Sequence, residues 1–570
     1  MGLGILEDNV MKDVPGTTRY FDDPERPQYA IDGEVIVTGL KCDTSGPVPI
    51  ILVPQPSDDP NDPLNWPLWK RDLITFILSV TAIFATSLGP ILAANTVTLS
   101  FWFKIPFGKA ALLTGYFLLG VGVAGFVFVP SGRIWGKRHL FILGTIILIA
   151  SSAWSGGCAP DRNYTCMLWS RIFQGIGAAP FESFVNAAVG DLYFVHQRGI
   201  RMAFTNLAVF GGAFFTPILV GKITHSLNWW WTFYLVSIFC TASLIAIILF
   251  CPETAYVRSA SLNLDLVARE NEVETEAKTR DDRTSADWET TTLAAPAADN
   301  GGNQVASAPR EQPKPTLWRW LALFNGRKTD EQFWKLLLRP LVMLLQPAFL
   351  WASLIQGTMI GWTVFIGVTL AQFTIATPLW WNEVKTGYAY VGPFVGALLG
   401  FAIAGGLADW SAKALTRRNG GVYEPEFRIL LVIPQLILGG IGLYGWGITA
   451  DGMLLRKYNV VVPLTFFGLE VAGMVIGAVA SSLYIVDAYR DLAIEGFTCM
   501  IIFKNLFSFA LTFKAYDWLI ENQTHARPLF NIIGSVQVGI CLTSIPMYIY
   551  GKRIRSYFHR NDLLDRFNLR

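Results

Sequence analysis

The sequence predicts an all-α membrane protein with twelve transmembrane helices in two six-helix halves. Two observations lead to this fold class: the composition of the chain and the spacing of its apolar runs. Of the 570 residues, 52% are hydrophobic and only 15% are charged, whereas an average soluble domain has about 25% charged residues. A soluble protein of this length needs more charged surface, so we expect most of the chain to lie in a lipid bilayer.

The apolar residues gather in runs that are long enough to cross a bilayer as helices, which takes about 20 mostly apolar residues. The spans expected in the first half are 72–94, 110–130, 139–157, 167–188, 202–222 and 230–251. The spans expected in the second half are 342–367, 384–406, 428–448, 461–484, 496–519 and 529–550.

Composition divides the chain into five parts. We expect a disordered cytoplasmic tail (1–70), a six-helix half (71–251), a cytoplasmic linker (252–340), a second six-helix half (341–551) and a cytoplasmic tail (552–570). Tail and linker are rich in charged residues, proline and small residues, which cannot bury enough apolar surface to fold.

The end of the linker, from Leu317 to Arg339, mixes aromatic and basic residues. This mixture suits a helix that lies in the membrane interface. It equally suits a simple cytoplasmic start of the seventh span, and the sequence leaves both interpretations open.

Three signs favour a topology with both termini in the cytoplasm. It places ten basic residues in inside loops and seven in outside loops, as the positive-inside rule requires. It also places both glycosylation sequons, at Asn163 and Asn522, outside. Cys158 and Cys166 share the first of these outside loops, so we expect a disulfide between them.

Three motifs resemble those of the major facilitator superfamily. Residues 168–179, centred on Arg171, match the motif of its fourth span, and residues 405–413, with Asp409, match its loop signature in the second half. In the first-half copy of that signature, Arg133 stands where the family has an aspartate. Residues 212–221 keep Gly212 and Pro217 of the antiporter motif but replace two of its glycines.

Further segments resemble the fungal drug:proton antiporter-type branch of the family, nearest the yeast histidinol and polyamine transporter group. The segments that carry this resemblance are 180–182, 191–199, 423–428 and 484–492. The resemblance covers about 62–555 and implies the twelve-helix fold and transport of small organic molecules.

Four charged residues are selected by their predicted depth inside spans: Glu182, Arg171, Glu470 and Lys504. Because a charge at membrane depth is costly, such residues need a partner or a water-filled cavity. We expect Glu182 or Glu470 to bind a proton, a cationic group of the substrate, or each in turn. Alternatively, Glu470 and Lys504 form an ion pair that only fixes packing. For Arg171 the resemblance implies a role in proton coupling, and the alternative is an anchor at the outer edge of the membrane.

The expected gating residues are Asp409, Asp487, Gly212 and Pro217. The resemblance assigns Asp409 to an interlock that steadies one gate, Asp487 lies at the inner end of a span, and Pro217 is expected to kink or hinge its helix. Glu495, at another inner end, is expected to be a helix-end charge in water.

These features together favour a proton-coupled transporter of secondary metabolites or drugs that works by alternating access. A polyamine or other organic-cation transporter and a non-transporting membrane sensor are the alternatives. The partners of the protein are expected to be lipid, protons and a small organic substrate. We expect no nucleic-acid partner, because the net charge of +2 provides no basic face. No phosphate-binding loop or metal-ligand pattern is found, so we expect no enzyme activity, cofactor or metal. We expect a monomer in the plasma membrane, or alternatively in an internal or vacuolar membrane.

Overall fold

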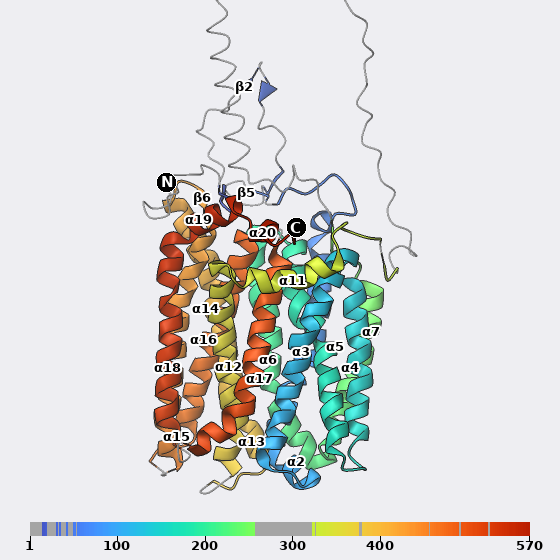
Figure 1. The fold of residues 1–570 in the computed structure, drawn as a ribbon, viewed down its shortest axis with the longest axis vertical. Coiled ribbons are helices and arrows are strands. Elements are labelled where there is room, and N and C mark those ends of the chain that lie inside the picture. Colours follow the sequence, from blue (N-terminus) through green and yellow to red (C-terminus); the bar gives the residue numbers. More distant parts are fainter. Residues whose placement is uncertain are drawn as a thin grey trace, which may run out of the picture.

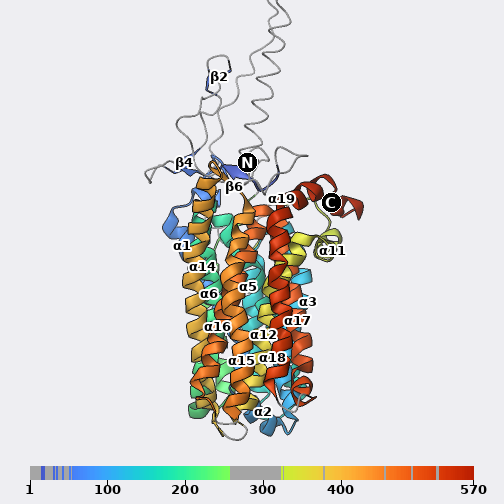
Figure 2. The ribbon, with the colours of Figure 1, turned by 90° about the vertical axis from the view of Figure 1, so that its left-hand side faces the viewer.

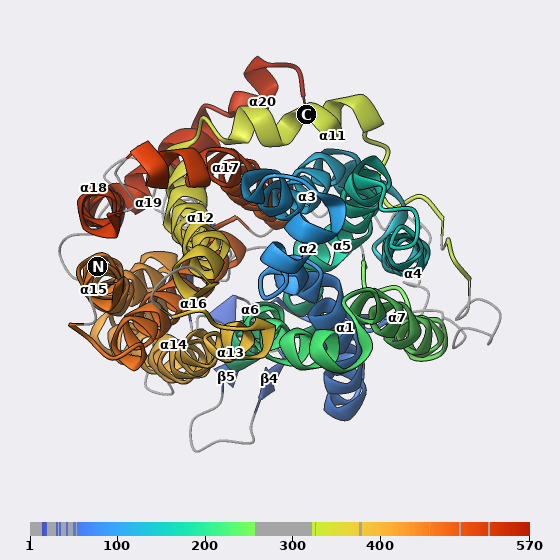
Figure 3. The same cartoon turned by 90° about the horizontal axis from the view of Figure 1, so that it is seen from below.

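Two groups of long helices stand side by side in one bundle, and they follow the two halves of the chain (Figures 1 and 3). The computed structural model describes residues 14–19, 30–31, 34–35, 41–43, 50–52, 54–256, 322–324, 326–375, 379–454, 457–489, 492–521 and 525–569. The long helices of the N-terminal half are α1 (Leu68–Ser87), α3 (Phe107–Trp135), α4 (Arg138–Gly157), α5 (Tyr164–Leu192), α6 (Val195–Leu227) and α7 (Trp230–Phe250). Those of the C-terminal half are α12 (Pro347–Ile375), α14 (Val391–Arg418), α15 (Val432–Leu454), α16 (Val461–Ala488), α17 (Ala493–Glu521) and α18 (Ala526–Leu542), which α19 (Ser544–Arg560) continues.

Ten of the helices in the described residues are long and apolar enough to cross a membrane. Helices α1 and α5 are not among them, because each carries polar residues that the packing of the bundle buries. In α1, Lys70, Arg71 and Asp72 place three charges among the first five residues. In α5, Arg171 and Glu182 interrupt the apolar sequence. Both helices nevertheless pack in the bundle against each other and against α6, and the predicted all-α membrane fold is confirmed.

Several helices, among them α3, α5, α6 and α16, are longer than the spans that hydropathy predicts. Helix α6 has 33 residues, or about 50 Å at 1.5 Å per residue, whereas the hydrocarbon core is about 30 Å thick. The extra turns carry polar and charged residues beyond the apolar run, and these residues make many of the contacts that join the halves.

The remaining elements are short and lie at the ends of the bundle. The short helices are η2 (Pro63–Asn65), η3 (Pro90–Leu92), α2 (Thr96–Phe103), α11 (Phe333–Met343), α13 (Glu383–Tyr388), η4 (Pro425–Leu431) and α20 (Leu563–Arg566). The strands form antiparallel pairs: β1 (Thr18–Arg19) with β6 (Val422–Tyr423), β2 (Ala30–Ile31) with β3 (Glu34–Val35), and β4 (Cys42–Asp43) with β5 (Ile50–Ile51).

Both termini lie at the same end of the bundle, together with α11, α19 and α20 (Figures 1 and 2). We call this end the terminal end, and we call the opposite end, which carries α2 and α13, the loop end. The shared end agrees with the predicted even number of spans. Which end faces the cytoplasm remains a prediction.

The expectation of a disordered tail over 1–70 is wrong for part of that range. Strand β1 pairs with β6 of the C-terminal half, and Thr17 donates a hydrogen bond of 2.7 Å to Glu424 Oε2. Closer to α1, Leu64 and Trp66 are buried. Apolar side chains spaced among the polar residues of this tail make the packing favourable, which overall composition does not reveal.

The linker predicted over 252–340 is also ordered at both of its ends. Glu253 accepts hydrogen bonds from the backbone N–H groups of Lys137 and Arg138, and α11 begins before the predicted boundary at 340. Of the two interpretations of 317–339, the structure contains a separate helix that lies across the terminal end, set off from α12 by residues 344–346. Residues 317–321 lie outside the described residues, and the position of α11 in the membrane interface remains a prediction.

Candidate functional site

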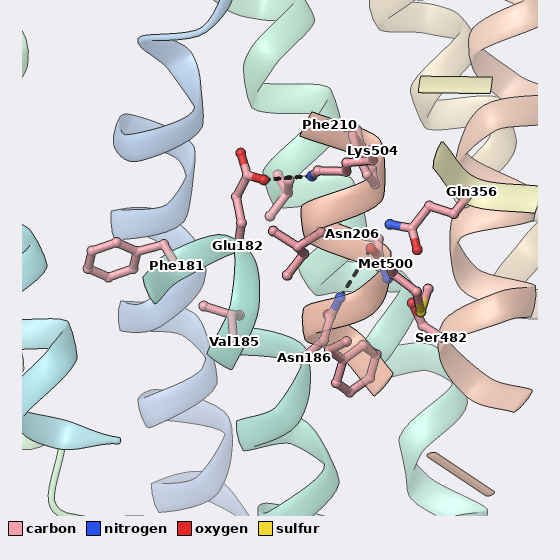
Figure 4. Close-up of a pocket in the computed structure, with 13 residues that line it drawn as sticks. Phe181, Glu182, Val185, Asn186, Asn206, Phe210, Gln356, Ser482, Met500 and Lys504 are labelled. Carbon is pink, nitrogen blue, oxygen red and sulfur yellow. Dashed lines mark hydrogen bonds and ion pairs between the residues drawn. The ribbon is translucent and has the colours of Figure 1, made fainter. Parts of the chain in front are cut away.

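A small cavity lies between the two halves, near the middle of the bundle (Figure 4). Its volume is about 20 Å³, and a water molecule needs roughly 10–15 Å³ on the same measure. It therefore holds about one water molecule in this conformation, and a substrate needs the halves to separate. The lining residues are Phe181, Glu182, Val185 and Asn186 of α5; Asn206, Val209 and Phe210 of α6; Gln356 of α12; Ser482 of α16; and Phe497, Met500, Ile501 and Lys504 of α17.

An ion pair joins the two halves at this cavity. Lys504 Nζ of α17 lies 2.6 Å from Glu182 Oε2 of α5, and each side chain is only 7% exposed. Figure 4 shows the two side chains pointing toward each other. Asn505 Nδ2 donates a second hydrogen bond to the same carboxylate oxygen, at 3.2 Å. Two residues from the predicted set of intramembrane charges are thus brought together, and Lys504 is the partner that a buried Glu182 needs.

Polar amides and aromatic rings surround the pair. Asn186 Oδ1 accepts a hydrogen bond of 2.8 Å from Thr205, and Asn206 donates one of 2.8 Å to the carbonyl of Met202. The ammonium group of Lys504 lies 5.8 Å from the centre of the Phe210 ring. A cation is therefore held by a carboxylate and by the face of an aromatic ring, and amide groups provide both donors and acceptors for a polar ligand.

Glu470 does not lie at this cavity and does not pair with Lys504. Its carboxyl group is fully buried within the C-terminal half, where Oε1 lies 2.7 Å from Thr363 Oγ1 of α12. The hypothesis of a Glu470–Lys504 packing pair is therefore wrong. Charged residues on spans that are consecutive in the chain were expected to form an ion pair, but the Lys504 side chain faces the N-terminal half instead.

Arg171 is also remote from the cavity, buried in the N-terminal half toward the loop end. Its guanidinium donates to the carbonyls of Leu113 and Gly89 and to Gln174 Oε1, at 3.1, 3.3 and 2.7 Å. The ring of Phe117 lies 5.1 Å below it. Because the side chain is fully buried, the interpretation as an anchor at the membrane edge is wrong. Its role in proton coupling remains a prediction.

At the terminal end, Asp409 and Asp487 lie where the two halves meet. Asp487 accepts hydrogen bonds from Tyr423 and Arg428, at 2.6 and 3.1 Å, and Arg198 of the N-terminal half approaches it to 3.9 Å. Asp409 lies 3.9 Å from the same Arg428. The two predicted gating carboxylates therefore share one arginine and face α6 of the other half.

Gly199 allows α6 to approach Asp409. A methyl group in place of its hydrogen would lie 2.0 Å from Asp409 Oδ1, so any side chain there would displace the Asp409 carboxylate. The close approach adds to the contacts that seal the terminal end.

A second charged cluster at the terminal end includes the linker. Arg133 of α3 forms ion pairs with Glu495 of α17 and, at 2.9 Å, with Glu331 of the linker. Arg339 of α11 binds the same two glutamates, at 3.7 and 2.7 Å. Although burial raises the pKa of Glu331, the hydrogen bonds and charges of Arg339 and Arg133 lower it below its ordinary value of 4.5. Glu331 therefore stays charged at neutral pH, and the cluster ties both halves to α11.

Glu495 was expected to be a helix-end charge in water, and this expectation is wrong. Its side chain is 0% exposed because both arginines of the cluster cover it. The family signature has an aspartate where this chain has Arg133. An arginine at this position needs an acidic partner on the facing helix, and Glu495 of α17 is that partner.

At the loop end, α13 closes the bundle against α2 and α6. Thr98 of α2 donates a hydrogen bond of 2.6 Å to Glu383 of α13. A methyl group at Gly387 of α13 would lie 2.5 Å from the carbonyl oxygen of Pro217, so α6 passes very close to α13 at its proline. Gly212 instead packs against Ile83 of α1, inside the N-terminal half. Contacts between the halves thus seal both ends, and the gating roles of Gly212 and Pro217 remain predictions.

The predicted outer loop between α4 and α5 lies at the loop end. Cys158 and Cys166 are joined by a disulfide. Asn163 is exposed and caps α5, accepting hydrogen bonds from the backbone N–H groups of Thr165 and Cys166. Asn522 lies outside the described residues. Glycosylation at both sequons remains a prediction.

Sequence reasoning missed the uncharged polar residues that line the cavity, Asn186, Asn206, Gln356 and Ser482, and Asn505, which binds Glu182. A signal for some of them was present, because an asparagine or glutamine inside an apolar span is also costly. Asn186 follows Glu182 by one helical turn and Asn505 follows Lys504 directly, so each could have been found next to a residue that was already chosen.

Comparisons with known proteins agree with this architecture. The proton:xylose symporter XylE, in a solved structure with 6-bromo-6-deoxy-D-glucose, matches with a TM-score of 0.54 and 14% identity, covering 85% of this chain and 97% of that one. Protein HOL1 of Saccharomyces cerevisiae is 26% identical over 585 residues, covering 96% of each chain. Efflux pump radE of Floropilus chiversii is 23% identical over 528 residues, covering 88% of this chain and 84% of the pump.

The model of one protein family matches most of the chain, over residues 74–492. That range includes ten of the twelve spans, the Arg171 motif, the Asp409 signature and most of the charged contacts that close the terminal end. With this match and two six-helix halves around a central cavity, the chain belongs to the Major Facilitator Superfamily.

Proposed function

We propose that this protein is a proton-coupled secondary active transporter of small organic molecules that works by alternating access to a site between its halves. Its family and relatives make it a membrane transporter and not an enzyme. The observation that carries the finer proposal is the Glu182–Lys504 pair. It joins the two halves inside a buried cavity and contains a carboxyl group that can exchange its partner.

In the proposed mechanism, three partners compete for Glu182: the ammonium of Lys504, a proton, and a positively charged group of the substrate. In the closed state Lys504 neutralises the carboxylate. When Glu182 binds a proton or the substrate, Lys504 is left as a buried cation without a counter-charge, which is strongly unfavourable. The halves then separate and let water reach the ammonium. Because proton and substrate use the same carboxylate, movement of one is coupled to movement of the other.

The proposed substrate is an organic molecule with a positive group and an apolar body. The carboxylate would hold the positive group, and Phe210 with Phe181 would contact the body. One relative is named an efflux pump and another a transporter of a citrinin biosynthesis cluster, which supports export of a secondary metabolite or drug. A polyamine or other organic cation is the second candidate, and the carboxylate at the centre of the site favours it.

The proposal extends to the placement of the protein in the cell. We place it as a monomer in the plasma membrane, with the terminal end in the cytoplasm and the Asn163 loop outside. The disulfide between Cys158 and Cys166 supports this orientation, because disulfides persist in oxidising compartments.

Transport by the purified full chain in lipid vesicles tests the proposal. An imposed pH gradient is expected to drive accumulation of labelled spermidine or of a cationic drug from a small panel, and Glu182→Gln is expected to abolish it. Asn163→Gln, at the exposed loop, is the matched control and should transport normally. If cationic probes move but Glu182→Gln leaves their transport unchanged, the assigned site is wrong. If no cationic probe moves, the proposed positively charged substrate is wrong, and a panel of uncharged metabolites then distinguishes a transporter of another substrate from a non-transporting sensor.

A further inference from the structure

Glu470 is a buried acid that the central cavity does not use. It lies on α16, 0% exposed, at the point where α16 packs against α12 and α15. Gly442 of α15 approaches so closely that a methyl group there would lie 2.4 Å from the backbone nitrogen of Glu470. The backbone of Glu470 is therefore tightly packed against α15, and its side chain is shielded from solvent.

The hydrogen bonds around Thr363 indicate how the carboxyl group is satisfied. Thr363 Oγ1 lies 2.7 Å from Glu470 Oε1 and 2.9 Å from the carbonyl oxygen of Met359. A hydroxyl group has one hydrogen and can donate it only once. If Glu470 carries a proton, its own O–H donates to Thr363, and the hydroxyl of Thr363 donates to Met359. Both contacts are then satisfied.

The ionised form would leave a charge without compensation. In the described residues, Glu470 Oε2 has no hydrogen-bond partner, and Thr363 is the single side chain that bonds to the carboxyl group. As the uncharged carbonyl oxygen of a protonated acid, Oε2 tolerates this position. As part of a carboxylate it would be a desolvated anion, which proteins avoid by binding a proton.

Among the residues that the structure describes, the helices around Glu470 place no basic side chain against it, and Lys504 of α17 pairs with Glu182 instead. Helix α12 contains no ionisable side chain. On α15, Tyr444 bonds to Ser535 and Asp451 accepts from the backbone N–H groups of Ala526 and Arg527, all toward the loop end. On α14, which packs on α16 through Gly396 and Gly400, Asp409 is the nearest ionisable residue, nine positions further toward the terminal end.

We propose that Glu470 carries a proton in this closed conformation and is a proton-binding site of the C-terminal half, separate from Glu182. Its place in the coupling cycle rests on the function proposed above, but its protonation does not. The proton joins α16 to α12 through Thr363. Ser481 and Gln356 join the same two helices at the cavity, at 3.4 Å. Loss of the proton would leave a desolvated carboxylate between the two helices that form the C-terminal wall of the cavity.

Infrared spectroscopy of the purified full chain in lipid vesicles tests this assignment without a substrate. At neutral pH the wild type should show the carbonyl stretch of a protonated carboxyl group that is lost in Glu470→Gln. In Thr363→Val the band should remain but move to higher frequency, because the carboxyl group loses its hydrogen-bond partner. Gln356→Leu, which removes the other contact between the two helices, is the control and should leave the band in place.

Identical spectra of wild type and Glu470→Gln would overturn the proposal, since the group would then be ionised. If Glu470→Gln does not fold, Thr363→Val decides: a shifted band supports the proposal and an unshifted one overturns it. If the wild type shows the infrared band but no pH-driven transport, the proton-binding site is supported and only the proposed coupling is refuted.

Discussion

Replacing Glu182 with glutamine should open the closed state. The variant keeps the size of the side chain but removes the charge that faces Lys504 at 2.6 Å, and both groups are only 7% exposed. Removing one partner of a buried ion pair costs about 3–5 kcal/mol, because the other charge is left uncompensated. At about 1.4 kcal/mol per factor of ten, the equilibrium between closed and open states should shift by about 100- to 4000-fold.

Labelling of a cysteine inside the cavity measures this shift. Ser482 lines the cavity and is 1% exposed, so Ser482→Cys reports how often the cavity opens to a water-soluble maleimide. The other unpaired cysteines would first be replaced by serine. Glu182→Gln should then increase the labelling rate strongly, and Lys504→Met should do the same by stranding the carboxylate.

The double variant provides the control for this reasoning. Glu182→Gln combined with Lys504→Met removes both charges, and replacing a buried pair by uncharged groups is often neutral for stability. Its labelling rate should return close to that of the parent protein, although transport stays lost. Single variants that label no faster than the parent, or a double variant that labels as fast as either single one, would refute the argument that the pair holds the halves together.

Three further predictions concern the ends of the bundle. Arg133→Gln should speed maleimide labelling of the buried native Cys499, which lies beside the charged cluster that includes the linker. The hydrogen bonds of the lost arginine contribute about 1–3 kcal/mol to closure of the terminal end. An unchanged labelling rate would show that the cluster does not close this end. Because the pKa of Glu331 is lowered in the folded protein, its ionised carboxylate stabilises the fold fully at pH values above the ordinary pKa of 4.5. That stabilisation is lost as the pH falls through the lowered pKa. The difference in melting temperature between wild type and Glu331→Gln should thus stay constant between about pH 5 and pH 7, and a change within that range would contradict the assignment. Cys158→Ser opens a disulfide loop with a sequence separation of 8, which should lower the free energy of unfolding by about 2.5 kcal/mol on loop entropy; equal denaturation curves with and without reductant would argue against it.

The sequence predicted the fold because apolar runs of membrane length are a strong signal. Helix α5 is not among the ten most apolar long helices, yet its apolar run was long enough to predict the span 167–188, and the motif around Arg171 supported that prediction. The same residues that make it polar, Arg171 and Glu182, were the ones expected to carry function. In this helix, the polar residues that lower its hydropathy also marked the candidate functional residues.

The pairing of charges could not be predicted from the sequence. Lys504 and Glu470 lie on consecutive spans, so a local rule paired them, whereas the real partner of Lys504 is Glu182 in the other half of the chain. Nothing in one sequence specifies how two six-helix halves rotate against each other, and that rotation decides which side chains meet. Glu495 was misjudged for the same reason, since the arginines that cover it come from α3 and α11.

Binding of spermidine to the purified protein tests the central claim, that an organic cation takes the place of Lys504 on Glu182, most directly. Isothermal titration calorimetry at neutral pH would compare wild type, Glu182→Gln and Lys504→Met. Loss of the competing ammonium should make Lys504→Met bind spermidine more tightly than wild type, and Glu182→Gln should not bind it. Equal affinities in all three proteins, or weaker binding by Lys504→Met than by wild type, would contradict the claim.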